Sequence, residues 1–168
     1  MTLEATNGLG ILSQYGPRTT EGKFGAEIGD DVLKTVVYDL DYTDLASTSA
    51  AAVQGLDYII PAYSTFKSCR IVVDEAVVGP TAITVGTYLA SDGTTAIDAD
   101  GLMTAAVGVV TALDAVGDMV VGTGAQLTTG TGAGWVLSAD AVIRILPTVA
   151  VATAGKIRVI VEYFARIP

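Results

Sequence analysis

Short stretches in which apolar and polar residues alternate recur along this chain, separated by Gly, Pro and Asp. Alternation with a period of two predicts β-strands, because successive side chains of a strand point to opposite faces. The clearest stretch is 156–167, where one predicted face carries Ile157, Val159, Val161 and Tyr163. We expect this strand to be paired inside a sheet rather than left at an edge.

Residues 66–73 and 82–90 alternate in the same way, and in the former Lys67, Cys69, Ile71 and Val73 share one predicted face. Further strands are expected at 32–40, 57–63, 118–127, 135–138, 141–146 and 148–152. Pro61 favours an edge or a bulge for its strand. Eight or more short strands with regular turns indicate an all-β sandwich or barrel.

Residues 102–116 are ambiguous, because their apolar side chains also fit a helical spacing. Asp100 is placed to cap a short helix there, although Gly108 would weaken it. We therefore expect at most one short helix in the chain.

Residues 1–30 differ from the rest, because six Gly and a Gly16-Pro17 pair interrupt every periodic pattern. Such a segment is either a loose terminus or an arm that orders against a neighbouring subunit. Large apolar groups, which a solvated tail would rarely carry, favour the arm: Leu9, Ile11, Leu12, Tyr15 and Phe24. We divide the chain into an extended N-terminal arm at 1–30 and a β-sandwich domain at 31–168.

The charge distribution argues against a nucleic-acid partner. The chain has 18 acidic and 9 basic residues, a net charge of −9, and no basic residue between Arg70 and Arg144. Nucleic-acid binding normally requires a clustered basic face.

The sequence offers little for catalysis. It contains no His and a single Cys, which excludes Ser-His-Asp and Cys-His nucleophiles and His-ligated metals. Cys69 is predicted to be a small buried core residue. We expect no enzymatic activity, no catalytic residues and no cofactor.

Two acidic groups are candidates for a binding or catalytic site. Asp98 and Asp100 resemble part of a calcium loop, but the fifth and twelfth positions are Leu102 and Val109. The second group, at a predicted strand end, consists of Asp39, Asp41 and Asp44. We expect these to be a solvated strand end rather than a glycosidase carboxylate pair. We assign no metal site, and calcium at the acidic turns stays an alternative.

No membrane partner is expected. Residues 119–139 are free of charge, but five Gly and four Thr interrupt them, which favours strands and loops over a spanning helix. The first residues lack the positive region and apolar block of a secretory signal. These features, with one unpaired Cys, suit synthesis in a reducing cytoplasm.

The order of several segments resembles that of small virion structural proteins of tailed bacteriophages, especially capsid decoration (cement) proteins. The segments are Tyr38-Asp39-Leu40, Ile60-Pro61-Ala62, residues 66–75, residues 95–101, residues 115–118, and Ala154-Gly155-Lys156 before Val161-Glu162-Tyr163. The resemblance covers roughly residues 32–166. It implies a two-sheet β-sandwich, jelly-roll-like, that assembles as an oligomer, commonly a homotrimer, on the capsid exterior.

This resemblance implies that the protein clamps neighbouring major capsid subunits and stabilises the expanded head. We expect the sheet body to form the trimer and the arm to reach the capsid subunit through Tyr15, Arg18, Lys23 and Phe24. The alternative is a tail, fibre or other virion-associated β-sandwich protein with a receptor- or glycan-binding role. A glycan-binding role predicts exposed aromatic residues near the acidic loops.

Overall fold

The structure is a computed structural model that describes residues 28–29, 33–50, 58–127 and 136–165. These residues form nine strands: β1 (Ile28–Gly29), β2 (Leu33–Asp41), β3 (Ile59–Ile60), β4 (Thr65–Val78), β5 (Ala82–Leu89), β6 (Ala96–Met103), β7 (Met119–Val121), β8 (Ala141–Thr148) and β9 (Ala154–Phe164). A 3-10 turn, η2 (Val110–Ala112), lies between β6 and β7.

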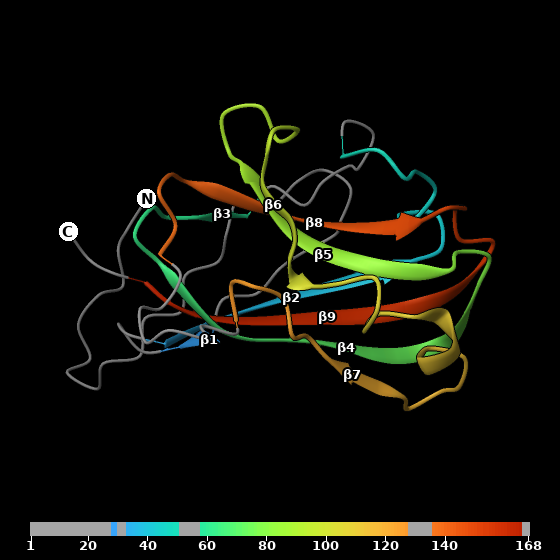
Figure 1. The fold of residues 1–168 in the computed structure, drawn as a ribbon. Coiled ribbons are helices and arrows are strands. Elements are labelled where there is room, and N and C mark those ends of the chain that lie inside the picture. Colours follow the sequence, from blue (N-terminus) through green and yellow to red (C-terminus); the bar gives the residue numbers. More distant parts are fainter. Residues whose placement is uncertain (1–27, 30–32, 51–57, 128–135, 166–168) are drawn as a thin grey trace, which may run out of the picture.

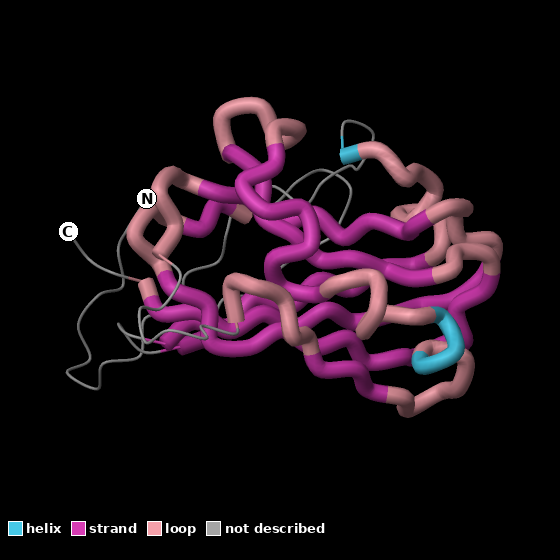
Figure 2. The backbone as a smooth tube through the Cα atoms, viewed as in Figure 1, coloured by secondary structure: helices cyan, strands magenta, loops and turns pink. Residues whose placement is uncertain are grey.

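The strands make two antiparallel sheets that face each other, so the predicted all-β two-sheet sandwich is confirmed (Figures 1 and 2). The five-stranded sheet has the order β1-β2-β9-β4-β7, and the four-stranded sheet has the order β3-β8-β5-β6. Paired strands are nested along the chain: β2 with β9, β3 with β8, β4 with β7, and β5 with β6. β4 also pairs with β9, and β5 with β8.

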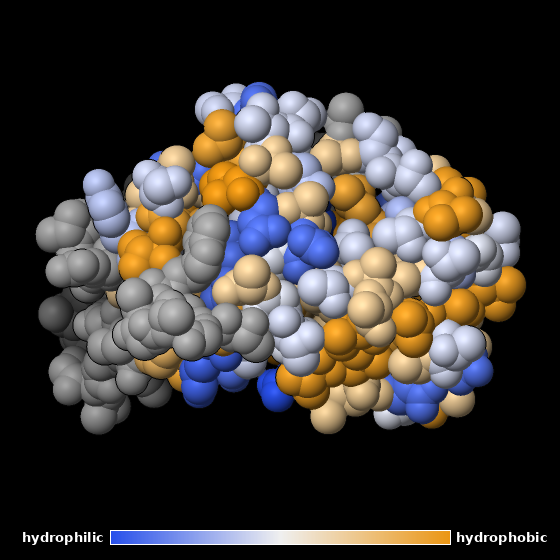
Figure 3. Space-filling view, viewed as in Figure 1, coloured by the Kyte–Doolittle hydropathy of each residue, from blue (hydrophilic) through white to orange (hydrophobic). Residues whose placement is uncertain are grey.

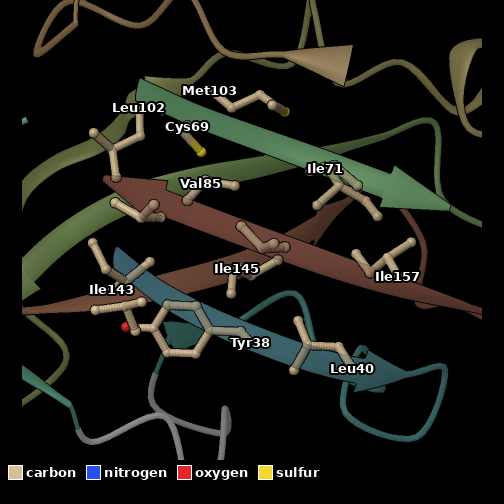
Figure 4. Close-up of a cluster of buried hydrophobic side chains, with 14 of the residues drawn as sticks. Tyr38, Leu40, Cys69, Ile71, Val85, Leu102, Met103, Ile143, Ile145 and Ile157 are labelled. Carbon is tan, nitrogen blue, oxygen red and sulfur yellow. The ribbon is translucent and has the colours of Figure 1, made fainter. Parts of the chain in front are cut away.

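The core lies between the two sheets and is built from the inward positions of the alternating strands (Figure 4). The four residues predicted to share one face of the last strand, Ile157, Val159, Val161 and Tyr163, are all fully buried. They meet Ile143 and Ile145 of β8 and Val85 of β5 from the opposite sheet. A period of two in the sequence therefore becomes one buried face per strand.

Two predictions about strand placement are confirmed. β9 lies between β2 and β4, so both of its sides are paired. β3 is the outermost strand of the four-stranded sheet, and Pro61 follows it directly. An edge position suits proline, because its nitrogen has no hydrogen to donate to a ladder.

The predicted face of β4 was wrong at Lys67, which it included, and at Phe66, which it left out. The register against β9 shifts between Phe66 and Ser68, so the strand carries a bulge there. Lys67 is exposed, whereas Phe66 is buried on the same side as Cys69 and Ile71. An extra residue in one strand reverses the alternation, which keeps the lysine out of the core.

Two other segments also differ from the prediction. Asp100 and Leu102 belong to β6, so Asp100 caps no helix, and helical geometry between β6 and β7 is limited to η2. A separate strand was expected at 148–152, but Thr148 ends β8 and the residues after it connect β8 to β9. The segment 95–101, which contains the Asp98 and Asp100 pair compared with a calcium loop, is mostly strand, although its register against β5 is irregular.

β6 is held in place by the segment that follows β7. Gly124 lies so close to β6 that an added Cβ would sit 2.2 Å from the carbonyl oxygen of Gly101. The amide of Gln126 donates to the same oxygen at 2.8 Å. Inside the sandwich, the side chains of Gln126 and Thr87 are buried and hydrogen-bonded to each other.

Most of the predicted arm lies outside the described residues. Within 1–30 only Ile28 and Gly29 are described, and they pair as β1 with Thr35 and Lys34 at the edge of the five-stranded sheet. The arm hypothesis stays a prediction.

Candidate interaction surface

The outward face of the five-stranded sheet is the broadest candidate surface, and we call it the outer sheet face. Residues opposite each other in an antiparallel ladder point to the same side. The ladder therefore aligns two rows across this face, Val37–Ile160–Arg70–Val121 and Asp39–Arg158–Val72–Met119.

Apolar groups on the outer sheet face are open to solvent. Met119 is 59% exposed and Val121 is 53% exposed, and both belong to β7. Val37, Val72 and Ile160 are half-buried by their neighbours in the sheet. β7 ends the sheet, so one side of its backbone has no strand partner among the described residues. Such an edge can accept another chain.

Ion pairs lie among these apolar groups. Arg158 donates to both carboxylate oxygens of Asp74, at 2.7 and 3.1 Å, and lies 3.8 Å from Asp39. The hydrogen bonds from Arg158 hold the pKa of Asp74 below its ordinary value. Glu162 accepts a hydrogen bond from the Ser68 hydroxyl at 2.7 Å and lies 3.9 Å from the Lys67 ammonium. Solvent screens such pairs, so they orient side chains more than they stabilise the fold.

Positive charge is concentrated on this sheet. The described basic residues are Lys34, Lys67, Arg70, Arg144, Lys156 and Arg158. All except Arg144 belong to β2, β4 or β9, whereas Arg144 is buried in β8 and donates to the carbonyl oxygen of Gly93. In an acidic protein, this places both signs of charge on one sheet and mainly acids elsewhere on the described surface.

The predicted contact residues cannot be placed on this surface. Tyr15, Arg18, Lys23 and Phe24 all lie outside the described residues. Their role in reaching a partner stays a prediction.

The acidic turns are held by hydrogen bonds within the turns themselves. The Asp92 carboxylate accepts from the amides of Thr94 and Thr95, each at 2.9 Å, and from the Thr95 hydroxyl. These donors lower its pKa to about 2. Asp98 belongs to β6 rather than to a turn; burial raises its pKa, and it accepts weakly from the amide of Asp100 at 3.4 Å. Across the described ranges, no three acidic or thiol side chains gather closely enough to hold a metal ion.

The carboxylates at the end of β2 also have local partners. Asp41 accepts from the amide of Thr43 at 2.8 Å, and Asp44 accepts from the amide of Asp41 at 3.1 Å. Asp39 faces Arg158 across the ladder. Two of the acids therefore shape the turn after β2, and the third belongs to the outer sheet face.

Cys69 is fully buried, as predicted, and its thiol is free. Burial raises its pKa to about 12. A thiol is a nucleophile only when ionised, so this residue is inert in the folded protein.

Exposed tyrosines do not converge on one place. Tyr42 follows β2 and is 46% exposed, whereas Tyr63 precedes β4 and is 59% exposed. The ends of β2 and β4 next to them pair with opposite ends of β9, at Lys156 and Phe164. These two residues therefore form no shared platform for a sugar ring.

Sequence reasoning missed the exposed pair Met119 and Val121. Strand character was predicted for their segment, but no local signal shows that β7 is the last strand of its sheet. Comparison with protein-family models, curated proteins and solved structures found no match. No helix within the described ranges is long and apolar enough to cross a membrane.

Proposed function

We propose that this chain is a non-enzymatic structural protein of a tailed-bacteriophage virion. It binds the outer surface of the capsid and clamps neighbouring major capsid subunits, which stabilises the expanded head. The proposal combines the resemblance of residues 32–166 to capsid decoration proteins with the character of the outer sheet face.

The outer sheet face is the observation that carries the proposal. It combines open apolar groups, Met119 and Val121, with paired charges such as Arg158 and Asp74. Protein interfaces have this composition, with apolar contact area for affinity and ordered charges that fix the partner's orientation. The face is a sheet surface and suits the side of another protein better than a small ligand.

The nested strand pairs support the same proposal. Pairing β2 with β9, β3 with β8, β4 with β7 and β5 with β6 is the order obtained when one long hairpin is rolled into two sheets. We interpret the sandwich as a jelly roll on this basis, an architecture that viral capsid domains and lectins share. Because one fold serves many functions, the assignment to a virion rests on the surface and the resemblance.

The proposed stabilisation of the expanded head follows from the binding equilibrium between the protein and the capsid shell. A protein that binds only the expanded shell stabilises that shell by the free energy of binding at each occupied position. A homotrimer with one footprint per copy adds the advantage of multivalency, because the second and third contacts form within one complex. In this proposal the outer sheet faces of the copies cover the capsid subunits.

The direct test is binding to purified, expanded capsids that lack the protein. Met119→Asp places a charge on the outer sheet face and should weaken binding about tenfold or more, as for a residue central to an interface. Tyr63→Asp is the matched control, because Tyr63 is equally exposed at 59% but lies in the turn between β3 and β4. If Met119→Asp binds the capsids as well as wild type and Tyr63→Asp do, the outer sheet face is not the footprint.

The arm hypothesis is tested separately. Deleting residues 1–27 leaves β1 intact and removes Tyr15, Arg18, Lys23 and Phe24. We expect weaker capsid binding with unchanged thermal unfolding. Undiminished binding would remove the arm from the proposal. Labelled antibodies on whole virions then decide the placement, because staining at a single vertex would favour the tail or fibre alternative over capsid decoration.

A further inference from the structure

Four uncharged segments meet at one end of the sandwich, and we call this surface the uncharged end. It comprises residues 45–50, 76–82, 104–113 and 145–155, none of which is acidic or basic. It includes the β4–β5 turn and the β8–β9 connection, which lie together at the right of Figure 1. Figure 3 shows apolar residues exposed at this right-hand end of the molecule, with hydrophilic residues below them.

Backbone hydrogen bonds join the segments into one surface. Donor–acceptor pairs at 2.8–3.1 Å are Ala152 to Leu45, Thr153 to Val78, Thr81 to Thr148, Val77 to Leu113 and Val110 to Thr81. The β4–β5 turn also touches the β8–β9 connection directly, since a Cβ added at Gly79 would lie 2.4 Å from the carbonyl oxygen of Val151. These contacts hold the surface in a defined shape.

Three valines project from the uncharged end. Val149 is 85% exposed, the largest fraction among the exposed large hydrophobic residues described, and Val78 and Val151 are 52% and 39% exposed. Val149 has a φ of 68° in the middle of a three-residue turn, closed by the Ala150 amide donating to Thr148 at 2.8 Å. β-Branched residues rarely adopt this backbone conformation. Strained residues of this kind tend to occur at functional sites.

The charge of the whole chain indicates which partner this surface fits. At a net charge of −9, two copies repel each other wherever their acidic surfaces approach. At the uncharged end, the copies can approach without bringing acids together. Charged residues directly flank its segments in the sequence, among them Asp44, Asp114 and Lys156. An apolar centre with a charged border is the usual anatomy of a protein interface.

We infer that the uncharged end is a contact site for a second copy of this chain, with Val149 at its centre. The inference rests on the self-assembly included in the proposed function and names the surface through which the copies meet. The outer sheet face is left free for the capsid. The contact is apolar, so screening by salt strengthens it by weakening the repulsion between copies.

The test measures solution mass by light scattering over about 5–200 μM protein, at about 0.15 M and at about 0.5 M NaCl. The screening length is about 8 Å at the lower salt concentration and shorter at the higher one. Wild type should be an oligomer whose mass is maintained or increased in high salt. Val149→Asp and Val149→Gly should each weaken self-association about tenfold or more. Val149→Gly removes the side chain at a position where glycine is favoured, so loss of folding cannot explain its effect.

Val136→Asp is the matched control. Val136 is 44% exposed and pairs with Thr65, at the opposite end of β4. The solution mass of the Val136→Asp variant should equal that of wild type. A monomeric wild type, an oligomer that dissociates in high salt, or Val149 variants with wild-type mass would each overturn the inference. Wild type that self-associates but does not bind bare capsids would instead remove the capsid role and leave this contact standing.

Discussion

Replacing Val149 by glycine should stabilise the folded monomer, although the change removes an apolar side chain. Val149 is held at a φ of 68° by the turn between β8 and β9. A residue confined to this left-handed region costs about 1–3 kcal/mol. Glycine has no Cβ and adopts the same conformation without a steric penalty.

Two opposing effects reduce the gain. Glycine increases the conformational entropy of the unfolded chain, which costs about 0.5–1 kcal/mol. The lost packing is small, because the side chain is 85% exposed. The net gain should be about 1 kcal/mol, which raises the Tm of a domain of this size by about 2–4 °C.

The assay is thermal unfolding followed by circular dichroism, at a concentration low enough for the chain to be monomeric. Val151→Gly is the control, because Val151 lies two residues further on without a positive φ. It should lower the stability by about 0.5–1 kcal/mol through the same entropy effect. If both variants lower the Tm equally, Val149 is not strained and the reasoning fails.

Three further predictions test the core and the acidic turns. Gln126→Ala should destabilise the fold by about 1–3 kcal/mol, because the buried Thr87 hydroxyl loses its partner. The double variant Thr87→Val with Gln126→Leu should recover most of that loss in urea unfolding, and no recovery would mean that other contacts of Gln126 dominate. The pKa of Asp92 is lowered to about 2, below the ordinary value of about 3.9, so its ionised form stabilises the fold above about pH 4. This contribution is lost as the pH falls through about 2, so the urea midpoints of wild type and Asp92→Asn should converge at the acid end, whereas a constant difference would contradict the lowered pKa. Burial raises the pKa of Cys69 to about 12, so a thiol reagent at about pH 8 should label it only at the rate of unfolding. Labelling within seconds of mixing would contradict its burial.

Strand identity was predictable where one face is fully buried. The alternation from Ile157 to Tyr163 is strict because every inward position of β9 meets the opposite sheet. Hydrophobic period alone therefore identifies the strand and its inner face. Its central position was also predictable, because an unpaired apolar strand would expose its backbone.

Prediction failed where structure depends on a partner strand. The bulge after Phe66 is set by the register of β4 against β9, which no local pattern records. Residues 148–152 alternate like a strand, but the chain must cross from one sheet to the other there, and a tight turn at Val149 begins the crossing. Pairing with β5 keeps the start of the helical spacing, up to Met103, in strand β6, and the residues after it form only the short η2.

The candidate surfaces were less predictable than the fold. Carboxylates near the acidic turns accept from neighbouring amides, as Asp92 does from Thr94 and Asp118 does from Ala115, and calcium binding at these turns stays an alternative. The uncharged end assembles segments more than 60 residues apart through contacts such as Thr81 with Thr148. Each of those segments is a loop or the end of a strand, and only the fold brings them together.

The pairing of β2 with β9 also determines when the protein can finish folding. Each residue from Leu33 to Asp41 is matched with one between Lys156 and Phe164, so the partners are far apart in the chain. Such non-local pairing gives slow folding, on a scale of about milliseconds to seconds. During synthesis on a ribosome, the five-stranded sheet cannot form completely until β9, which lies between β2 and β4, has been synthesised. Until then the inner faces of β2 and β4 stay exposed, and the growing chain is most vulnerable to aggregation at that stage.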